Sequence, residues 1–247
     1  MCESRVMARS LRLDYPGAMH HVFTRGMSRS AVALDDADYE KSLALLARAV
    51  PRFGLRCHAW CYLPNHSHLL LTSELGNLSR AMHWLGTCTA QSFNKRHEHS
   101  GHVYEGRFGS RLVEDEGYLL ELARYLPLNP VRAELCTAPG DWPWSSYAAT
   151  VGLDAEPAFL ETGTLLGALG SRGAYAAWVA DGVLATTLDA RGVPLPPPRP
   201  ALSTLLADTS ERAVAAAHFR HGYTKAVIAR HLGISRAQLR GRLSPAT

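Results

Sequence analysis

The chain has 247 residues, of which 47% are hydrophobic and 19% are charged, a composition that fits one or two folded domains and excludes a generally disordered protein. No run approaches the roughly 18 consecutive apolar residues of a membrane span, and the N-terminus has no apolar signal region, so we expect a cytoplasmic protein without a membrane partner. The net charge of +4 is uneven, because residues 209–247 carry 7 Lys and Arg against 1 Glu. Such a basic segment indicates a polyanionic partner, most often nucleic acid, although a solvated tail has the same composition.

The first 130 residues alternate strand-like and helix-like patterns. In chain order we predict a strand over 20–25, a helix over 36–50, strands over 55–63 and 66–72, a helix over 77–95 with Asn77 as its cap, a glycine-punctuated strand or hairpin arm over 101–114, and a helix over 115–129. Because the strand pairs are short-linked and mixed with helices, this order predicts an α+β, ferredoxin-like fold. Its antiparallel sheet would carry the helices on one face.

The remainder of the chain is predicted to be helical. Residues 151–190 have helical patterns, and the proline-rich run 194–200 reads as a stiff linker. We therefore place three parts at 7–150, at 151–202 (a helical connector and the linker) and at 203–247.

The last part resembles a basic helix-turn-helix, with Ala229 where the helices cross, Gly233 at the turn, and a shared core of Val227, Ile228, Leu232, Leu239 and Leu243. The recognition helix would present Ser235, Arg236, Gln238 and Arg240 to DNA. A basic three-helix module that contacts protein is the alternative.

The sharpest local feature is the pair His66 and His68. Residues two apart on a strand project from the same face, so both imidazoles can meet one metal ion. Imidazole is the commonest metal ligand, and a divalent ion there could polarise a phosphate. With 12 histidines in the chain, such a pair can also arise by chance.

Tyr125 and Asn129 form a second feature at the end of the predicted helix 115–129. They are four residues apart and therefore share a helix face. Asn offers a carbonyl oxygen as a third ligand for Mg²⁺ or Mn²⁺, and Tyr offers a phenolate that can attack phosphorus. The alternative is an ordinary helix end in which Asn129 caps, Pro130 stops the helix and Tyr125 is core.

Together, these features resemble the REP-associated tyrosine transposases. These are HUH single-strand DNA transposases with an IS200-like domain and one catalytic tyrosine. The resemblance spans most of residues 7–150. It is carried by Pro64-Asn65-His66-Ser67-His68 and by the segments 7–17, 20–26, 77–80, 93–96, 101–108, 125–133 and 142–147.

The resemblance implies a function and roles for matching residues. His66 and His68 match the metal-binding pair, Asn129 the third ligand and Tyr125 the nucleophile, with Mg²⁺ or Mn²⁺ as the cofactor. The implied reaction is attack on a phosphodiester of single-stranded or hairpin DNA, which leaves a 5′-phosphotyrosine and a free 3′-hydroxyl and later reverses. It also implies a bacterial, nucleoid-associated protein. The predicted helix-turn-helix indicates duplex DNA, in a hairpin stem or a flanking site, as a further partner, and a homodimer is allowed.

Three positions depart from the family pattern. Ser67 stands where a large hydrophobic residue is usual, but we expect it to face away from the histidines. Met27 replaces the usual Asn after Arg25-Gly26, and Pro127 is expected to kink the helix between Tyr125 and Asn129. The family's usual start aligns with Met7, so residues 1–6 are expected to be a start-site artefact.

Residues 101–111 alternate basic and aromatic side chains. We interpret this as a surface for DNA backbone and base stacking, although aromatic strand residues also occur in cores. The residues concerned are His102, Tyr104, Arg107 and Arg111. Two other functions remain open from the sequence: a DNA-binding regulator with an unused catalytic site, and a metallohydrolase that uses water and stays active without Tyr125.

Overall fold

The computed structural model describes residues 13–182, 201–210, 213–214, 217, 225–235 and 238–239. The chain divides into two compact units. Unit 1 contains residues up to Leu112 with Trp144–Ser146 and Pro157–Glu161, and unit 2 contains Val113–Pro143, Tyr147–Glu156 and the residues from Thr162 onward. The three parts predicted from the sequence stay predictions. Within the described residues, no helix is both long and apolar enough to span a membrane.

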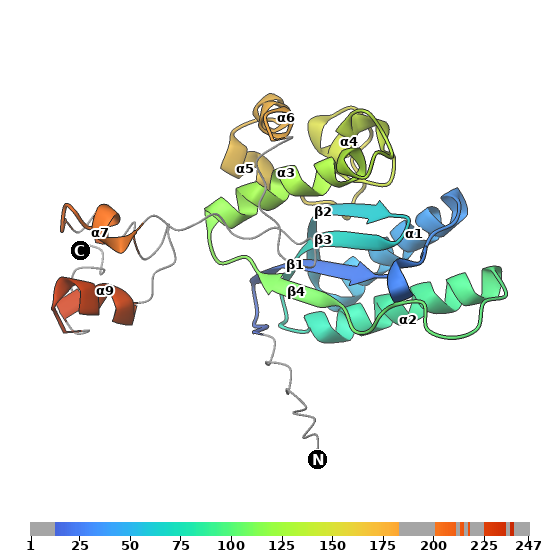
Figure 1. Cartoon of the computed structure of the whole chain (residues 1–247), viewed down its shortest axis with the longest axis horizontal. Coiled ribbons are helices and arrows are strands. Elements are labelled where there is room, and N and C mark those ends of the chain that lie inside the picture. The colour runs from blue at the N-terminus through green and yellow to red at the C-terminus, as the bar shows by residue number, and fades with distance from the viewer. Residues whose placement is uncertain are drawn as a thin grey trace, which may run out of the picture. The chain divides into compact units, whose positions relative to one another are not determined.

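Unit 1 is built on a four-stranded antiparallel sheet (Figure 1). Its strands are β1 (Ala18–Arg25), β2 (Leu55–Leu63), β3 (His66–Ser73) and β4 (Gly109–Leu112), arranged in the order β2-β3-β1-β4. β1 pairs with both β3 and β4, and β2 pairs with β3, all antiparallel. This is the order of a ferredoxin-like split β-α-β arrangement, so the predicted antiparallel α+β sheet is confirmed.

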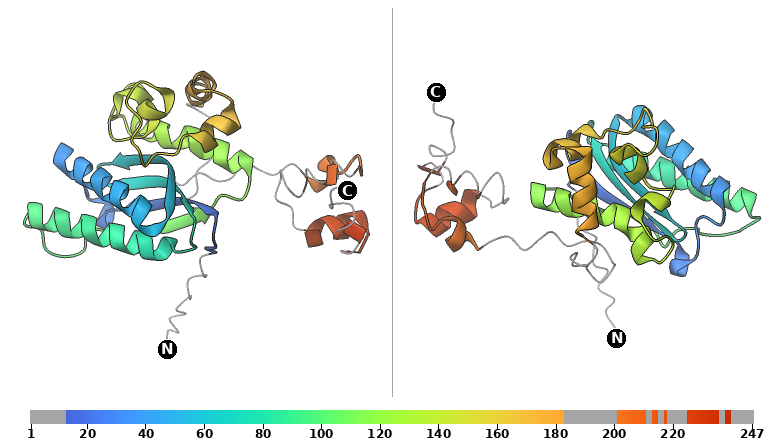
Figure 2. Two further views of the ribbon diagram at one scale, coloured as in Figure 1. Left: turned by 180° about the vertical axis from the view of Figure 1, so that it is seen from behind. Right: turned by 90° about the horizontal axis from the view of Figure 1, so that it is seen from above.

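Helices α1 (Asp36–Phe53) and α2 (Leu78–Arg96) cover one face of this sheet (Figure 2). Val22, Leu69 and Leu71 are at most 1% exposed and form part of the core under the helices. A cavity of about 30 Å³ remains in this layer, lined among others by Thr24, Ser67 and Tyr104. The opposite face of β1 and β3 is the one that carries His66 and His68.

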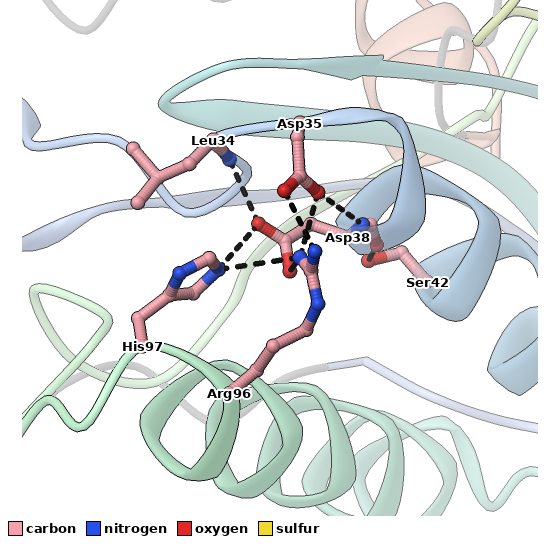
Figure 3. A network of polar contacts seen from close by, with 6 residues as sticks. All are labelled: Leu34, Asp35, Asp38, Ser42, Arg96 and His97. Atoms are coloured by element: carbon pink, nitrogen blue, oxygen red, sulfur yellow. Dashed lines mark hydrogen bonds and ion pairs between the residues drawn. The ribbon is translucent and has the colours of Figure 1, made fainter.

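The two helices are joined by an ion-pair network that we call the helix clamp, formed by Asp35, Asp38, Arg96 and His97 (Figure 3). Asp35 caps α1, accepting from the N–H of Asp38, and also accepts from Arg96 Nη1 and Nη2 at 2.6 and 2.7 Å. Asp38 is 6% exposed and accepts from Leu34 N, Arg96 Nη1 and His97 Nε2. Burial raises the pKa of Asp38, but these bonds outweigh it and hold the pKa below its usual value.

The beginning of α2 differs from the expected cap. Asn77 occupies the N-cap position, but its side chain makes no capping bond. Instead Asp14, 64 residues away in sequence, accepts from the N–H of Leu78 at 2.8 Å. A carboxylate at this end also complements the helix dipole.

Two later segments, Trp144–Ser146 and Pro157–Glu161, lie along β2, one of the two edge strands. Ser145 bridges Cys61 and Leu160 bridges Cys57, and the N–H of Tyr62 donates to Trp144 O. They occupy backbone groups that an edge strand otherwise exposes.

Unit 2 is helical around α3 (Glu116–Arg132), with α4 (Tyr147–Val151), α5 (Gly163–Leu169) and α6 (Arg172–Ala180). α3 continues through Pro127 and Pro130, so Pro130 does not stop the helix and the alternative of a helix end at Asn129 is wrong. Pro127 cannot donate to Ala123 O, its partner four residues earlier. The hydroxyl of the buried Tyr175, from α6, donates to this carbonyl at 2.9 Å instead.

The C-terminal helices include α7 (Leu202–Leu205) and α9 (Lys225–Leu232). Ile228 and Leu239, two predicted core residues, are fully buried in one cluster, with Leu232 packed against it. Gly233 has φ +65° and ends α9 with a Schellman pair of bonds, from Gly233 N to Arg230 O and from Ile234 N to Ala229 O. Two further core predictions, the side chain of Val227 and Leu243, lie outside the described residues.

After this turn, Ser235 and Gln238 form a reciprocal capping box: Ser235 N donates to Gln238 Oε1 at 2.9 Å, and Gln238 N donates to Ser235 Oγ at 3.2 Å. A helix start at Ser235 is what the predicted helix-turn-helix requires, but the motif stays a prediction. Arg236 and Arg240 lie outside the described residues.

Candidate active site

His66 and His68 project from the sheet face opposite α1 and α2. In the β1–β3 register Arg25 pairs with His66 and Phe23 pairs with His68, and directly paired residues share a face. The two imidazole centroids lie 5.1 Å apart, with ring planes 87° to each other. Ser67 points the other way, where its hydroxyl is 2.8 Å from that of Thr24, so the expected orientation of Ser67 is confirmed.

Both imidazoles are held neutral. Burial, followed by the charge of Arg25, lowers the pKa of His66 to about 4. Burial, together with His21, His66 and Arg25, lowers the pKa of His68 well below its usual value. At neutral pH each ring therefore has one nitrogen with an available lone pair, which is the form that binds metals.

Asn65 fixes which nitrogen of His66 has the available lone pair. Nδ1 of His66 lies 2.6 Å from Oδ1 of Asn65. An amide oxygen only accepts, so Nδ1 of His66 carries the proton and Nε2 carries the lone pair. His66 is thereby prepared to ligate through Nε2.

Two neutral imidazoles on one face can bind a divalent metal ion. Such an ion would need further ligands to complete its coordination. Among the described residues, no group of three His, Cys, Asp or Glu side chains could hold a metal. The role of Asn129 as a third ligand stays a prediction.

Tyr125 and Asn129 lie on α3, in unit 2, four residues apart and therefore on the same side of the helix. Nδ2 of Asn129 donates to Tyr125 O at 2.9 Å, which leaves Oδ1 as the atom suited to ligation. Tyr125 is 2% exposed, and the guanidinium of Arg132 lies 5.6 Å from its ring centroid. The structure thus pairs the predicted nucleophile with the predicted third ligand on one helix.

The predicted DNA surface of residues 101–111 separates into two kinds of side chain. His102 and Arg107 are exposed, and Arg111 pairs with His21 in the β1–β4 register, so it lies on the face that carries the histidine pair. Tyr104 instead lies inward: it packs against the cluster of Val32, Phe93 and Val103, and burial raises its pKa to about 12.

Residues 15–127 match the family model described as "Transposase IS200 like". This segment is an IS200-like transposase domain. A solved REP-associated tyrosine transposase, bound to a REP hairpin, has a TM-score of 0.51 and is 18% identical over 63% of this chain and 92% of that chain. At that identity the likeness shows a shared fold, and with the family match it confirms the resemblance carried by the motifs.

A second solved structure, of a Deinococcus radiodurans R1 protein described as a candidate transposase, has a TM-score of 0.35 and is 16% identical over 52% of this chain and 92% of that chain. No relative was found among curated proteins.

Sequence reasoning missed three residues around the histidines of this transposase domain. His21 lies with Nε2 3.0 Å from Nδ1 of His68, Asn65 bonds His66, and Arg25 pairs with His66 in register. The signal was available: alternation along β1 places residues 21, 23 and 25 on one face. It became informative only once the pairing of β1 with β3 was known.

Proposed function

We propose that the chain is a metal-dependent transposase that cleaves and rejoins single-stranded or hairpin-forming DNA through a tyrosine nucleophile. The observation that carries this proposal is the pair of neutral imidazoles, His66 and His68, on one sheet face of an IS200-like transposase domain. A water-using hydrolase needs the same metal site, so the distinction rests on Tyr125.

The two histidines and Asn129 would hold the metal. Bound there, Mg²⁺ or Mn²⁺ would align the scissile phosphate and stabilise the charge that develops on its oxygens. His66 supplies Nε2, fixed by Asn65, and Asn129 supplies Oδ1, fixed by its amide bonds to the backbone. Arg25 and Arg111, on the face of the histidine pair, add positive charge that attracts a phosphate.

Tyr125 would carry out the covalent step. Its phenolic oxygen forms a bond to phosphorus as the bond from phosphorus to the DNA 3′-oxygen breaks. The phenol loses its proton and the 3′-oxygen gains one, so the products are a 5′-phosphotyrosine and a 3′-hydroxyl. The energy of the phosphodiester is retained, and the reverse reaction can join the 5′ end to another 3′-hydroxyl.

The environment of Tyr125 sets one condition for this step. Because the residue is 2% exposed, its hydroxyl must become accessible before it can meet DNA. The guanidinium of Arg132 lies 5.6 Å from the ring centroid of Tyr125, where its positive charge can interact with the ring face.

Two surfaces would bind the DNA. In unit 1, His102 and Arg107 are exposed next to the strand that carries Arg111. The basic C-terminal segment would grip duplex DNA, such as a hairpin stem or a flanking site, through its predicted helix-turn-helix. A hairpin substrate is supported by the solved transposase of similar fold, which is bound to a REP hairpin.

The test incubates the protein with Mn²⁺ and labelled single-stranded repeats from the neighbourhood of its own gene. We expect a protein–DNA band that resists denaturant, is lost in Tyr125→Phe and His66→Ala, and is retained in Ser67→Ala, the matched control on the opposite face of β3. Cleavage that persists in Tyr125→Phe would support the hydrolase. Tight binding without cleavage would support the regulator.

The same variants test a dimer. If the metal site of one chain works with Tyr125 of its partner, mixing Tyr125→Phe with His66→Ala restores adduct formation. No restoration is expected if each chain acts alone.

A further inference from the structure

His21, on β1, is in contact with the candidate metal ligand His68. Its Nε2 lies 3.0 Å from Nδ1 of His68, and the ring centroids are 5.1 Å apart with the planes inclined by 28°. His21 is 0% exposed and His68 is 3% exposed, so bulk water does not compete for this bond. The contact joins residues 47 positions apart in sequence.

The bond determines which nitrogen of His68 can bind a metal. With Nε2 of His21 3.0 Å away, Nδ1 of His68 has no room for a metal ion on its lone-pair side. Nε2 of His68 is therefore the ligating atom, as Nε2 is for His66. A neutral imidazole that ligates through Nε2 carries its proton on Nδ1, and this proton then points at His21.

We propose that His21 is the positioning residue for His68: its Nε2 accepts the Nδ1 proton of His68 and so holds the Nε2 lone pair of His68 ready for the metal. Neutral His21 then carries its own proton on Nδ1. Asn65 does the same for His66 through its amide oxygen, so each member of the pair has one partner that fixes its tautomer. Outer partners of this kind orient metal-binding histidines and tune their basicity. The inference rests on the proposed metal site.

The first test needs no metal, and it reads the tautomer in the wild-type chain. Two-bond proton–nitrogen correlation spectra of the ¹⁵N-labelled, metal-free full chain at pH 7.5 report the tautomer of each histidine, and His68→Asn assigns the His68 signals. We expect His68 to carry its proton on Nδ1. A His68 ring with the proton on Nε2 would mean that His21 donates rather than accepts, and would overturn the proposal.

The second test measures Mn²⁺ affinity from the electron paramagnetic resonance signal of free Mn²⁺. His21→Phe keeps a ring but removes the acceptor, and loss of such a partner is expected to weaken binding by about 10–100-fold. His21→Gln restores an acceptor close to the position of Nε2 and should recover most of the affinity. His20→Gln is the matched control, because His20 is adjacent and 1% exposed but pairs with Leu71 on the other face of the sheet.

The outcomes separate the two proposals. Unchanged Mn²⁺ affinity in folded His21→Phe overturns the role of His21 alone. Absence of Mn²⁺ binding in the wild-type chain overturns the proposed metal site and, with it, the role of His21 as its support. If His21→Phe does not fold, the wild-type tautomer still decides.

Discussion

Replacing Tyr175 by Phe should destabilise the helix that carries Tyr125. Pro127 deprives Ala123 O of its helical donor, and the Tyr175 hydroxyl is 2.9 Å from that carbonyl in the interior of unit 2. Burial raises the pKa of Tyr175, so its hydroxyl stays protonated and able to donate. Removing it leaves a buried carbonyl without this partner, which costs about 1–3 kcal/mol.

A double-mutant cycle with Pro127→Ala tests the reasoning directly. Ala at position 127 supplies the missing N–H, so Ala123 O keeps a donor when Tyr175→Phe is added. We therefore expect the cost of Tyr175→Phe to be smaller by about 1–2 kcal/mol in the Pro127→Ala background than in the wild-type background. Urea unfolding of the full chain, followed by circular dichroism, measures the four free energies.

The same cycle has a functional readout. If α3 loosens, formation of the covalent DNA adduct should slow in Tyr175→Phe and recover in the double variant, because Tyr125 lies two residues before Pro127. An equal cost of Tyr175→Phe in both backgrounds would refute the role assigned to its hydroxyl.

Three further predictions concern unit 1. Ser67→Val should leave Mn²⁺ affinity unchanged because Ser67 faces away from the histidines. Its free energy of unfolding should stay within about 1 kcal/mol of the wild-type value, since filling part of the 30 Å³ cavity offsets the lost hydroxyl bond. Arg96→Lys should lower the melting temperature less than Arg96→Met does, because Lys keeps the charge but not the two-pronged contact with Asp35; equal losses would argue against the helix clamp. The free energy of unfolding should fall as the pH drops from about 6.5 to 4. In the unfolded chain His66 is protonated near pH 6.5, whereas in the folded chain its imidazole stays neutral until about pH 4. A melting temperature that is constant over this range would contradict this prediction.

Local patterns predicted most of unit 1. The alternating pattern predicted strands over 55–63 and 66–72, and the structure has β2 at Leu55–Leu63 and β3 at His66–Ser73. The same pattern placed both histidines on one face. The same rule placed Ser67 on the opposite face. These features depend on neighbours in sequence, which is why they could be read without the fold.

The features that escaped prediction depend on contacts between distant residues. His21 contacts His68 only because β1 pairs with β3. At the start of α2, the side chain of Asp14 rather than that of Asn77 accepts the backbone N–H bond that caps the helix. α3 runs through Pro127 because a tertiary contact offsets the effect of this proline: the hydroxyl of Tyr175 donates to the carbonyl of Ala123 that Pro127 leaves without a helical donor. For Tyr104 the alternation along residues 101–111 left open a DNA surface or a core position, and its packing against Val32 and Phe93 depends on residues distant in sequence.

We propose Tyr125 as the nucleophile, and mass spectrometry can identify the residue that attacks DNA. The sample is the digested covalent complex formed with Mn²⁺ and a cleavable single-stranded repeat. We predict that the DNA 5′-phosphate is attached to the peptide that contains Tyr125, with a free 3′-hydroxyl on the released strand. Attachment to another residue, or cleaved DNA with a free 5′-phosphate and no protein adduct, would show that Tyr125 is not the nucleophile.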